Sequence, residues 1–195
     1  MATPRLLERY RKDILPALKE RFSYSTVAAV PRVEKVVVNV GTGRLAVVKD
    51  TKMMERIVKD LTTITGQKPA VRKAKKSIAG FKLREGLDVG YMVTLRGTRM
   101  YDFIDRLISL ALPRTRDFQG IPATAFDQAG NLNIGIKEQT IFPEVAYDTL
   151  KDIFGLEVTV VTTAHTKEEG DELLRRMGFP LRSADEKRAV KAKKK

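Results

Sequence analysis

The sequence contains no cysteine and no tryptophan, and it has a single histidine. Without cysteine the chain can form neither a disulfide scaffold nor a thiolate metal site, and it offers no thiol nucleophile. A reducing, intracellular setting is therefore natural. His165 has no second histidine with which to share a metal ion, so we expect no metal site.

Long apolar runs are also missing from the chain. No stretch approaches the ~18 consecutive apolar residues that a membrane-spanning helix needs, and the first 30 residues are dense in charge. We therefore expect neither a membrane span nor a signal peptide, and we expect a cytoplasmic protein. Nucleophile elbows, phosphate-binding loops and clustered acid pairs are missing too, so we expect no catalytic residue and no cofactor.

Acidic residues are scarce relative to basic ones, with 24 Asp and Glu against 37 Lys and Arg and a net charge of +13. Residues 1–137 carry 26 basic and 13 acidic side chains, whereas residues 138–180 carry 4 and 9. Since the body of the chain is basic without help from its tail, we expect a polyanionic partner. Nucleic acid fits this better than the alternative, an anionic membrane.

Helical periodicity of the apolar residues predicts four helices. They span Leu6–Phe22, Asp50–Gly66, Met100–Ala111 and Thr166–Gly178. The first is expected to cover the core and to bend near Pro16, and the third is halted by Pro113. The fourth opens with a capping box of Thr166 and Glu169.

Alternating patterns predict four strands. They span Val33–Val40, Val89–Arg96, Asn131–Lys137 and Leu156–Thr163. The order of the elements predicts an α+β fold, in which helices pack on one face of a mainly antiparallel sheet and a basic loop protrudes. We expect one RNA-binding domain over residues 1–180 and a flexible basic tail over residues 181–195.

The densest basic segment runs from Leu61 to Arg84 and contains seven basic residues and no acidic one. Its run from Arg72 to Lys76 is expected to form the protruding loop, where uncompensated cations can meet phosphates. Phe81 is expected in the core because Ile78 and Leu83 flank it, with base stacking as the alternative.

Polar side chains share one face of two predicted strands. Asn39, Thr94 and Arg96 fall opposite the branched apolar residues of their strands. Such side chains on an open sheet can hydrogen-bond sugars, phosphates and base edges. The alternative is an ordinary hydrated sheet face.

An enzymatic alternative rests on Gly41, Gly43 and Ala46, which follow a strand and match the loose dinucleotide-binding pattern G-x-G-x-x-A. Asp60 lies 19 residues after Gly41, near the position of the ribose-binding acid. Repeated βαβ units do not follow, so a nicotinamide-dependent enzyme is the weaker hypothesis.

Longer motifs point to a known family. They are Pro31–Val36 with Asn39–Gly41, Gly66–Pro69, Lys75–Phe81, Val93–Gly97, Pro113–Gly120 and Glu138–Glu144. Over about residues 5 to 180 the chain closely resembles the bacterial ribosomal protein L five family. This resemblance implies a structural constituent of the large ribosomal subunit without catalytic activity, located in cytoplasmic ribosomes. Members bind 5S rRNA, join it to large-subunit rRNA in the central protuberance, and contact P-site tRNA and a small-subunit head protein.

The resemblance also implies roles for particular positions. The 5S rRNA site implied by motif position, with its basic and polar-face neighbours, comprises Lys35, Asn39, Gln67, Lys68, Thr94 and Arg96. The tRNA-binding loop comprises Arg72, Lys73, Lys75, Lys76 and Ser77. The acid-biased stretch after Lys137 suits a basic partner such as the small-subunit protein. A nonspecific RNA-binding module remains the alternative.

Overall fold

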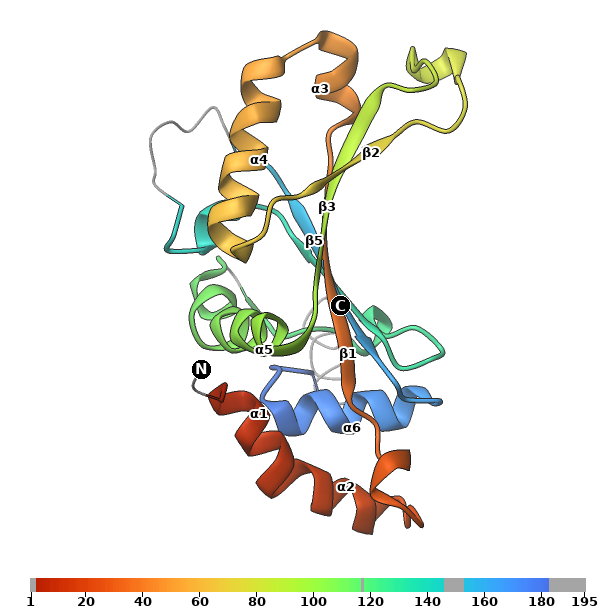
Figure 1. Ribbon diagram of the computed structural model, residues 1–195, viewed down its shortest axis with the longest axis vertical. Coiled ribbons are helices and arrows are strands. Elements are labelled where there is room, and N and C mark those ends of the chain that lie inside the picture. Colours follow the sequence, from red (N-terminus) through yellow and green to blue (C-terminus); the bar gives the residue numbers. More distant parts are fainter. Residues whose placement is uncertain (1–2, 117, 146–152, 183–195) are drawn as a thin grey trace, which may run out of the picture. The chain divides into compact units, whose positions relative to one another are not determined.

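A computed structural model describes residues 3–116, 118–145 and 153–182 of the chain (Figure 1). These residues form two compact units. The first draws on residues 3–36, 96–134 and 159–182, and the second on residues 37–95 and 135–158, within the described parts. Each unit combines separate stretches of the chain. The single domain expected over residues 1–180 stays a prediction. Most of the tail, residues 183–195, lies outside the described residues.

Five strands of the described chain form one sheet in the order β2-β3-β1-β5-β4. They are β1 (Val33–Gly41), β2 (Ala70–Lys73), β3 (Asp88–Leu95), β4 (Leu132–Ile136) and β5 (Leu156–Thr162). The sheet is antiparallel, which confirms the predicted α+β class. The four predicted strands are all present with ends that differ by at most one residue, whereas β2 was not predicted.

The second unit contains the helices α3 (Gly43–Val48) and α4 (Thr51–Thr65). At the start of α4 the Asp50 carboxylate accepts a hydrogen bond from the Met53 N–H at 3.1 Å. At its end Gly66 takes the left-handed conformation, with φ +68°, which a residue without Cβ adopts at little cost. The predicted helix from Asp50 to Gly66 is confirmed.

Burial in the second unit follows the periods of helix and strand. On α4 the fully buried apolar residues are Ile57, Leu61 and Ile64, and α4 contacts β3. On the strands every second residue is buried: Val38 and Val40 on β1, and Tyr91, Val93 and Leu95 on β3. One face of these strands is therefore core, and the side chains of opposite phase are left for another use.

The described residues of the first unit include four α-helices. They are α1 (Arg5–Arg9), α2 (Leu15–Arg21), α5 (Gly97–Arg106) and α6 (Lys167–Met177). Leu6, Tyr10, Ile14 and Leu18 are buried along the N-terminal helical segment, which confirms that it covers a core. The Tyr10 hydroxyl donates to the Pro31 carbonyl at 3.0 Å, and burial raises the pKa of Tyr10 to about 12.

Both prolines that were expected to disturb helices follow a widened helical segment. The π-helical segments Tyr10–Ile14 and Leu107–Ala111 each end two residues before a proline, Pro16 in one case and Pro113 in the other. Proline lacks an N–H, and its ring crowds the carbonyl four residues earlier, so a wider turn relieves the conflict. After Pro113 the helical path ends at Arg114 in a 3₁₀ turn.

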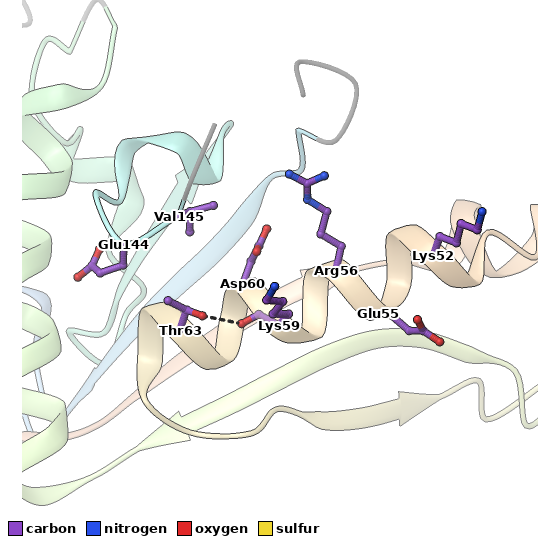
Figure 2. Close-up of a pocket in the computed structure, with 8 residues that line it drawn as sticks. All are labelled: Lys52, Glu55, Arg56, Lys59, Asp60, Thr63, Glu144 and Val145. Carbon is purple, nitrogen blue, oxygen red and sulfur yellow. Dashed lines mark hydrogen bonds between the residues drawn. The ribbon is translucent and has the colours of Figure 1, made fainter. Parts of the chain in front are cut away.

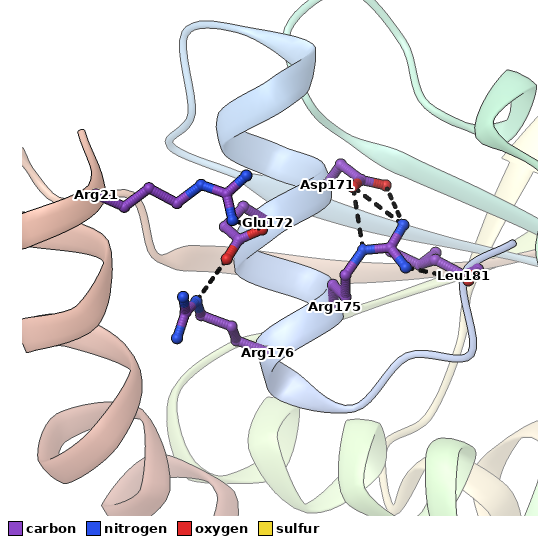
Figure 3. A network of polar contacts seen from close by, with 6 residues as sticks. All are labelled: Arg21, Asp171, Glu172, Arg175, Arg176 and Leu181. Atoms are coloured by element: carbon purple, nitrogen blue, oxygen red, sulfur yellow. Dashed lines mark hydrogen bonds and ion pairs between the residues drawn. The ribbon is translucent and has the colours of Figure 1, made fainter. Parts of the chain in front are cut away.

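Helix α6 is anchored by charged side chains (Figure 3). The carboxylate of Glu172, a residue only 7% exposed, lies 2.6 Å from both Arg21 of α2 and Arg176 of α6. One turn away, Arg175 pairs with Asp171 at 3.2 Å and donates to the Leu181 carbonyl at 3.3 Å. A buried carboxylate requires such partners, because a charge without them would be costly.

The start of α6 shows the predicted capping box. The Thr166 hydroxyl accepts from the Glu169 N–H at 3.3 Å, and the Glu169 carboxylate accepts from the Thr166 N–H at 3.4 Å. Within this first turn Gly170 packs directly on Gly130. A Cβ atom added at Gly170 would meet the Gly130 Cα at 2.6 Å, so the approach of these two segments requires glycine.

Replacing Gly170 with Ala should destabilise the protein by roughly 1–3 kcal/mol, because the new methyl group would force backbone apart. Gly43→Ala is the matched control, since Gly43 also lies in a helix and has open space around it. That control should be neutral or stabilising by up to ~1 kcal/mol. Urea denaturation of both variants measures the difference, and an unchanged midpoint for Gly170→Ala would contradict the close contact.

Candidate RNA interface

The uncovered face of the strands in the second unit presents polar side chains. Asn39 of β1 is exposed, and Thr94 of β3 is half-buried, both out of phase with the buried valines. Antiparallel pairing sets Ala70 opposite Met92 and Arg72 opposite Gly90, so Arg72 lies on the same face as Thr94. We call Asn39, Arg72, Met92 and Thr94 the open sheet face.

Gln67 is held beside this face by its surroundings at the end of α4. Its Nε2 donates to the Thr94 carbonyl at 3.4 Å, and its backbone N–H donates to the Thr65 hydroxyl at 3.3 Å. Thr65 itself is buried and lies 2.6 Å from the Leu61 carbonyl. The structure thus brings Gln67 next to β3, and the neighbouring Lys68 is exposed without an ion-pair partner among the described residues.

Lys35 and Arg96, the other two residues of the predicted 5S site, belong to the first unit. Lys35 is half-buried on β1. The Arg96 guanidinium lies 3.2 Å from the carboxylate of Glu34, and about half of each side chain is exposed. A pair this exposed adds little stability, but it partly offsets the charge of Arg96. The sequence did not predict this ion pair, because Glu34 lies in β1 whereas Arg96 is the N-cap residue of α5, 62 positions further along the chain.

The predicted loop from Arg72 to Lys76 is partly wrong. Arg72 and Lys73 lie in the edge strand β2, which pairs with β3 and has an irregular register between these two residues. The run of charges suggested a loop, yet an edge strand has one free side and tolerates charge on every residue. All four residues of β2 are exposed. The Arg72 guanidinium lies 3.4 Å from the Met92 sulfur, on the open sheet face.

The segment that follows β2 is a closed hairpin rather than an irregular loop. The Ala74 N–H donates to the Leu87 carbonyl at 2.8 Å, and Ile78 and Leu83 exchange backbone hydrogen bonds at 3.0 and 3.2 Å. The Ser77 hydroxyl accepts from the Glu85 N–H at 2.9 Å, so this predicted site residue also helps to close the turn. We call residues 70–87 the basic hairpin.

The cations of the basic hairpin form no ion pair among the described residues, although Glu85 belongs to the hairpin. Lys75 and Lys76 are exposed, and within the described parts of the chain neither has an ion-pair partner. Phe81, expected in the core, is 71% exposed. The expectation failed because Ile78 and Leu83 pair with each other across the hairpin, while the 3₁₀ turn Ala79–Phe81 directs the ring outward.

A hollow lies beside α4, where Lys52, Arg56 and Lys59 follow one another at helical spacing (Figure 2). Its volume is about 460 Å³. Three acidic residues, among them Asp60 and Glu144, line it as well. Because the charges balance, this hollow does not concentrate positive potential as the basic hairpin does.

The residues of the dinucleotide-binding pattern are not arranged as that site requires. Gly41 ends β1 and Gly43 opens the short helix α3, but the strand that follows, β2, is an antiparallel edge strand rather than the parallel neighbour of a βαβ unit. Asp60 lies within α4, away from any strand end.

The single histidine takes part in the cap of α6. The backbone N–H of His165 donates to the Glu169 carboxylate at 2.8 Å.

Two further features concern the described residues alone. No helix among them is both long enough and apolar enough to cross a membrane. They also contain no group of three or more His, Asp or Glu side chains that could hold a metal ion.

Comparison with known families decides between the hypotheses. Residues 27–84 match the model of the family described as ribosomal protein L5, and residues 88–181 match the model of the C-terminus of that ribosomal family. The chain belongs to this ribosomal protein family. It is therefore a structural constituent of the large ribosomal subunit, found in ribosomes in the cytoplasm, and the hypothesis of a nicotinamide-dependent enzyme is wrong.

Curated relatives match most of the chain, and each is named large ribosomal subunit protein uL5. The relative from Syntrophomonas wolfei is 58% identical over 178 residues, which are 91% of this chain and 99% of the relative. The relative from Rubrobacter xylanophilus is 54% identical, with 91% and 98% covered. The relative from Chloroflexus aurantiacus is 53% identical, with 92% and 99% covered.

The pairing of Arg96 with Glu34 has a measurable consequence. Glu34→Gln should free the guanidinium for one more phosphate and steepen the slope of log affinity for RNA against log salt by about 0.7–0.9. The matched control is Glu8→Gln, which changes the net charge equally but removes only a loose pair with Lys12 at 4.0 Å. If the two variants change the slope equally, Arg96 does not contact RNA.

Proposed function

We propose that this large-subunit protein binds 5S rRNA through Asn39, Gln67 and Thr94, with Lys35, Lys68 and Arg96 at adjacent positions of the sequence. The observation that carries the proposal is the hydrogen bond of Gln67 to the Thr94 carbonyl, which holds a polar side chain that follows α4 against β3, the strand that carries Thr94. These side chains can donate and accept hydrogen bonds at once. Asn39 and the Thr94 hydroxyl have no hydrogen-bond partner among the described residues, so they are available to a ligand.

The shape of RNA helices supports this choice of surface. A-form RNA presents a wide, shallow minor groove with 2′-hydroxyls and base edges, which polar side chains on a flat sheet can reach. Contacts to base edges give sequence selectivity, whereas cations alone would bind the phosphates of any RNA. The alternative of a nonspecific RNA-binding module predicts equal affinity for 5S rRNA and for an unrelated RNA of equal length.

Asn39→Ala and Thr94→Ala should each weaken 5S rRNA binding by about 1–3 kcal/mol, because their RNA partners would become buried without a hydrogen bond. Thr63→Ala is the control, since Thr63 is an exposed residue on the outer side of α4 whose hydroxyl bonds to the Lys59 carbonyl. Titration at fixed salt measures the affinity. Full affinity in a folded Asn39→Ala/Thr94→Ala variant would remove the open sheet face from the 5S site.

We further propose that the basic hairpin binds P-site tRNA. The Ala74 N–H donates to the Leu87 carbonyl and the Gly86 N–H donates to the Ala74 carbonyl. Together with the bonds between Ile78 and Leu83, these hold the hairpin in a defined conformation. Lys75 and Lys76 lie between these bonds, so their ammonium groups are presented together. The four cations within Arg72–Lys76 repel one another, whereas the negative charges of a phosphate backbone would neutralise them.

The position of Arg72 and Lys73 in β2 divides the hairpin into two testable parts. Lys75→Gln/Lys76→Gln should flatten the salt slope for tRNA on reassembled ribosomes by up to about 2 units, at roughly one phosphate for each cation. Arg72→Gln/Lys73→Gln should affect 5S binding as well, since Arg72 lies on the open sheet face. If Lys75→Gln/Lys76→Gln abolishes 5S binding while tRNA binding is untouched, the assignment of the hairpin is wrong.

The remaining partners of the proposal are large-subunit rRNA and a small-subunit head protein. Residues 138–180 carry 9 acidic and 4 basic side chains, which suits a basic protein surface. Some of this acid is engaged within the fold, because Glu172 and Asp171 pair with arginines. Exposed members such as Glu157 and Glu168 are the ones that a basic partner could reach.

A further inference from the structure

An apolar groove lies in the second unit between α3 and the basic hairpin. It has a volume of about 380 Å³ and is lined by Gly43, Arg44, Val47, Val48, Phe81 and Leu83. Arg44 is the one charged residue in this lining, as far as the chain is described. Phe81 and Leu83 lie in the basic hairpin, but no residue of this lining is among the individual side chains proposed above to contact 5S rRNA or tRNA. The groove itself has no role in that proposal.

Two large apolar side chains beside this groove are strongly exposed. Val48 is 78% exposed and Phe81 is 71% exposed, the highest values among the exposed large apolar residues described. Leaving them in water forgoes about 25 cal/mol for each Å² that could be buried. Exposed apolar groups gathered around a groove indicate a binding surface, whereas scattered ones do not.

A lysine in a strained conformation follows each of these apolar residues. Lys49 has φ +59° and Lys82 has φ +54°, the left-handed region that disfavours residues with a Cβ. Each ends a helical turn, since the Lys49 N–H donates to the Ala46 carbonyl and the Lys82 N–H to the Ala79 carbonyl, both within 3.3 Å. Strain of this kind persists where the surrounding structure imposes it. Lys49 and Lys82 thus directly follow Val48 and Phe81, two residues of the groove lining, along the chain.

We propose that this groove receives a single base unstacked from RNA, with the ring of Phe81 against the base and Arg44, Lys49 and Lys82 against the flanking phosphates. Apolar walls suit the flat face of a base, and cations without ion-pair partners in the described chain suit its phosphates. An acidic peptide would match the charge but would present no flat ring to Phe81. The inference rests on the proposed RNA binding of the basic hairpin, but not on which RNA is bound.

Two synthetic RNA hairpins with equal numbers of phosphates test the proposal on the full chain. One carries a single unpaired 2-aminopurine, and in the other that nucleotide is paired. The protein should quench the fluorescence of the unpaired base and prefer that RNA by roughly 5- to 150-fold, the range expected for one stacked base. Phe81→Tyr should keep the preference, and Phe81→Ala should abolish it.

Two controls separate stacking from charge and from folding. Val71→Ala removes another exposed apolar side chain of the basic hairpin, outside the groove, and should leave the preference intact. Arg44→Gln/Lys82→Gln should flatten the salt slope for both RNAs alike, because cations read phosphates. Circular dichroism checks that each variant is folded.

The outcomes distinguish this inference from the proposed function. A preference that survives in folded Phe81→Ala, or a 2-aminopurine that stays bright in the complex, overturns the inference. An acidic protein that is released by Phe81→Ala while RNA binding stays unchanged would do the same and would identify a protein site. The 5S titrations with Asn39→Ala and Thr94→Ala are independent of this groove. If those two variants bound 5S rRNA with full affinity, the inference about the groove would be unaffected.

Discussion

Alternation of burial along β1 and β3 is the constraint on which the proposed interface depends. Val38 and Val40 are at most 1% exposed, as are Val93 and Leu95, so the pairing register of these strands cannot slip by one residue. A slip would expose every one of these apolar side chains to water and would bury Asn39 and Thr94. The hydrophobic effect that holds α4 on one face thereby determines which polar groups the other face presents.

The position of β2 at the edge of the sheet explains how strongly charged residues can take part in strand pairing. β2 has β3 as its one neighbour in the described sheet, and its four residues are exposed, so Arg72 and Lys73 stay hydrated while their backbone pairs. Charge on an edge strand also discourages pairing with another chain. The same side chains are then available to phosphates, so protection of the edge and attraction of RNA are compatible.

The acidic bias of residues 138–180 is smaller at the surface than the composition implies. Glu172 is buried between Arg21 and Arg176, Asp171 pairs with Arg175, and the Glu169 carboxylate accepts backbone N–H groups at the start of α6. These contacts fasten α6 in the first unit, where Gly170 also lies against Gly130. Counting charges along a sequence therefore overstates the field that a partner would meet, because paired carboxylates contribute little to it.

Local patterns of residues were enough to determine four of the strands, the core-facing side of β1 and β3, and the caps at Asp50 and Thr166, because each depends on neighbours close in sequence. The family followed from longer motifs such as Lys75–Phe81 and Val93–Gly97. Local patterns were not enough for β2, whose charged residues form a strand only because β3 supplies the hydrogen-bonding partner. Nor could they place Phe81, which the pairing of Ile78 with Leu83 turns outward. The ion pair of Arg96 with Glu34 and the contact of Gln67 with Thr94 join residues 62 and 27 positions apart. Such contacts arise when tertiary packing brings distant segments together, and no pattern along the chain encodes them.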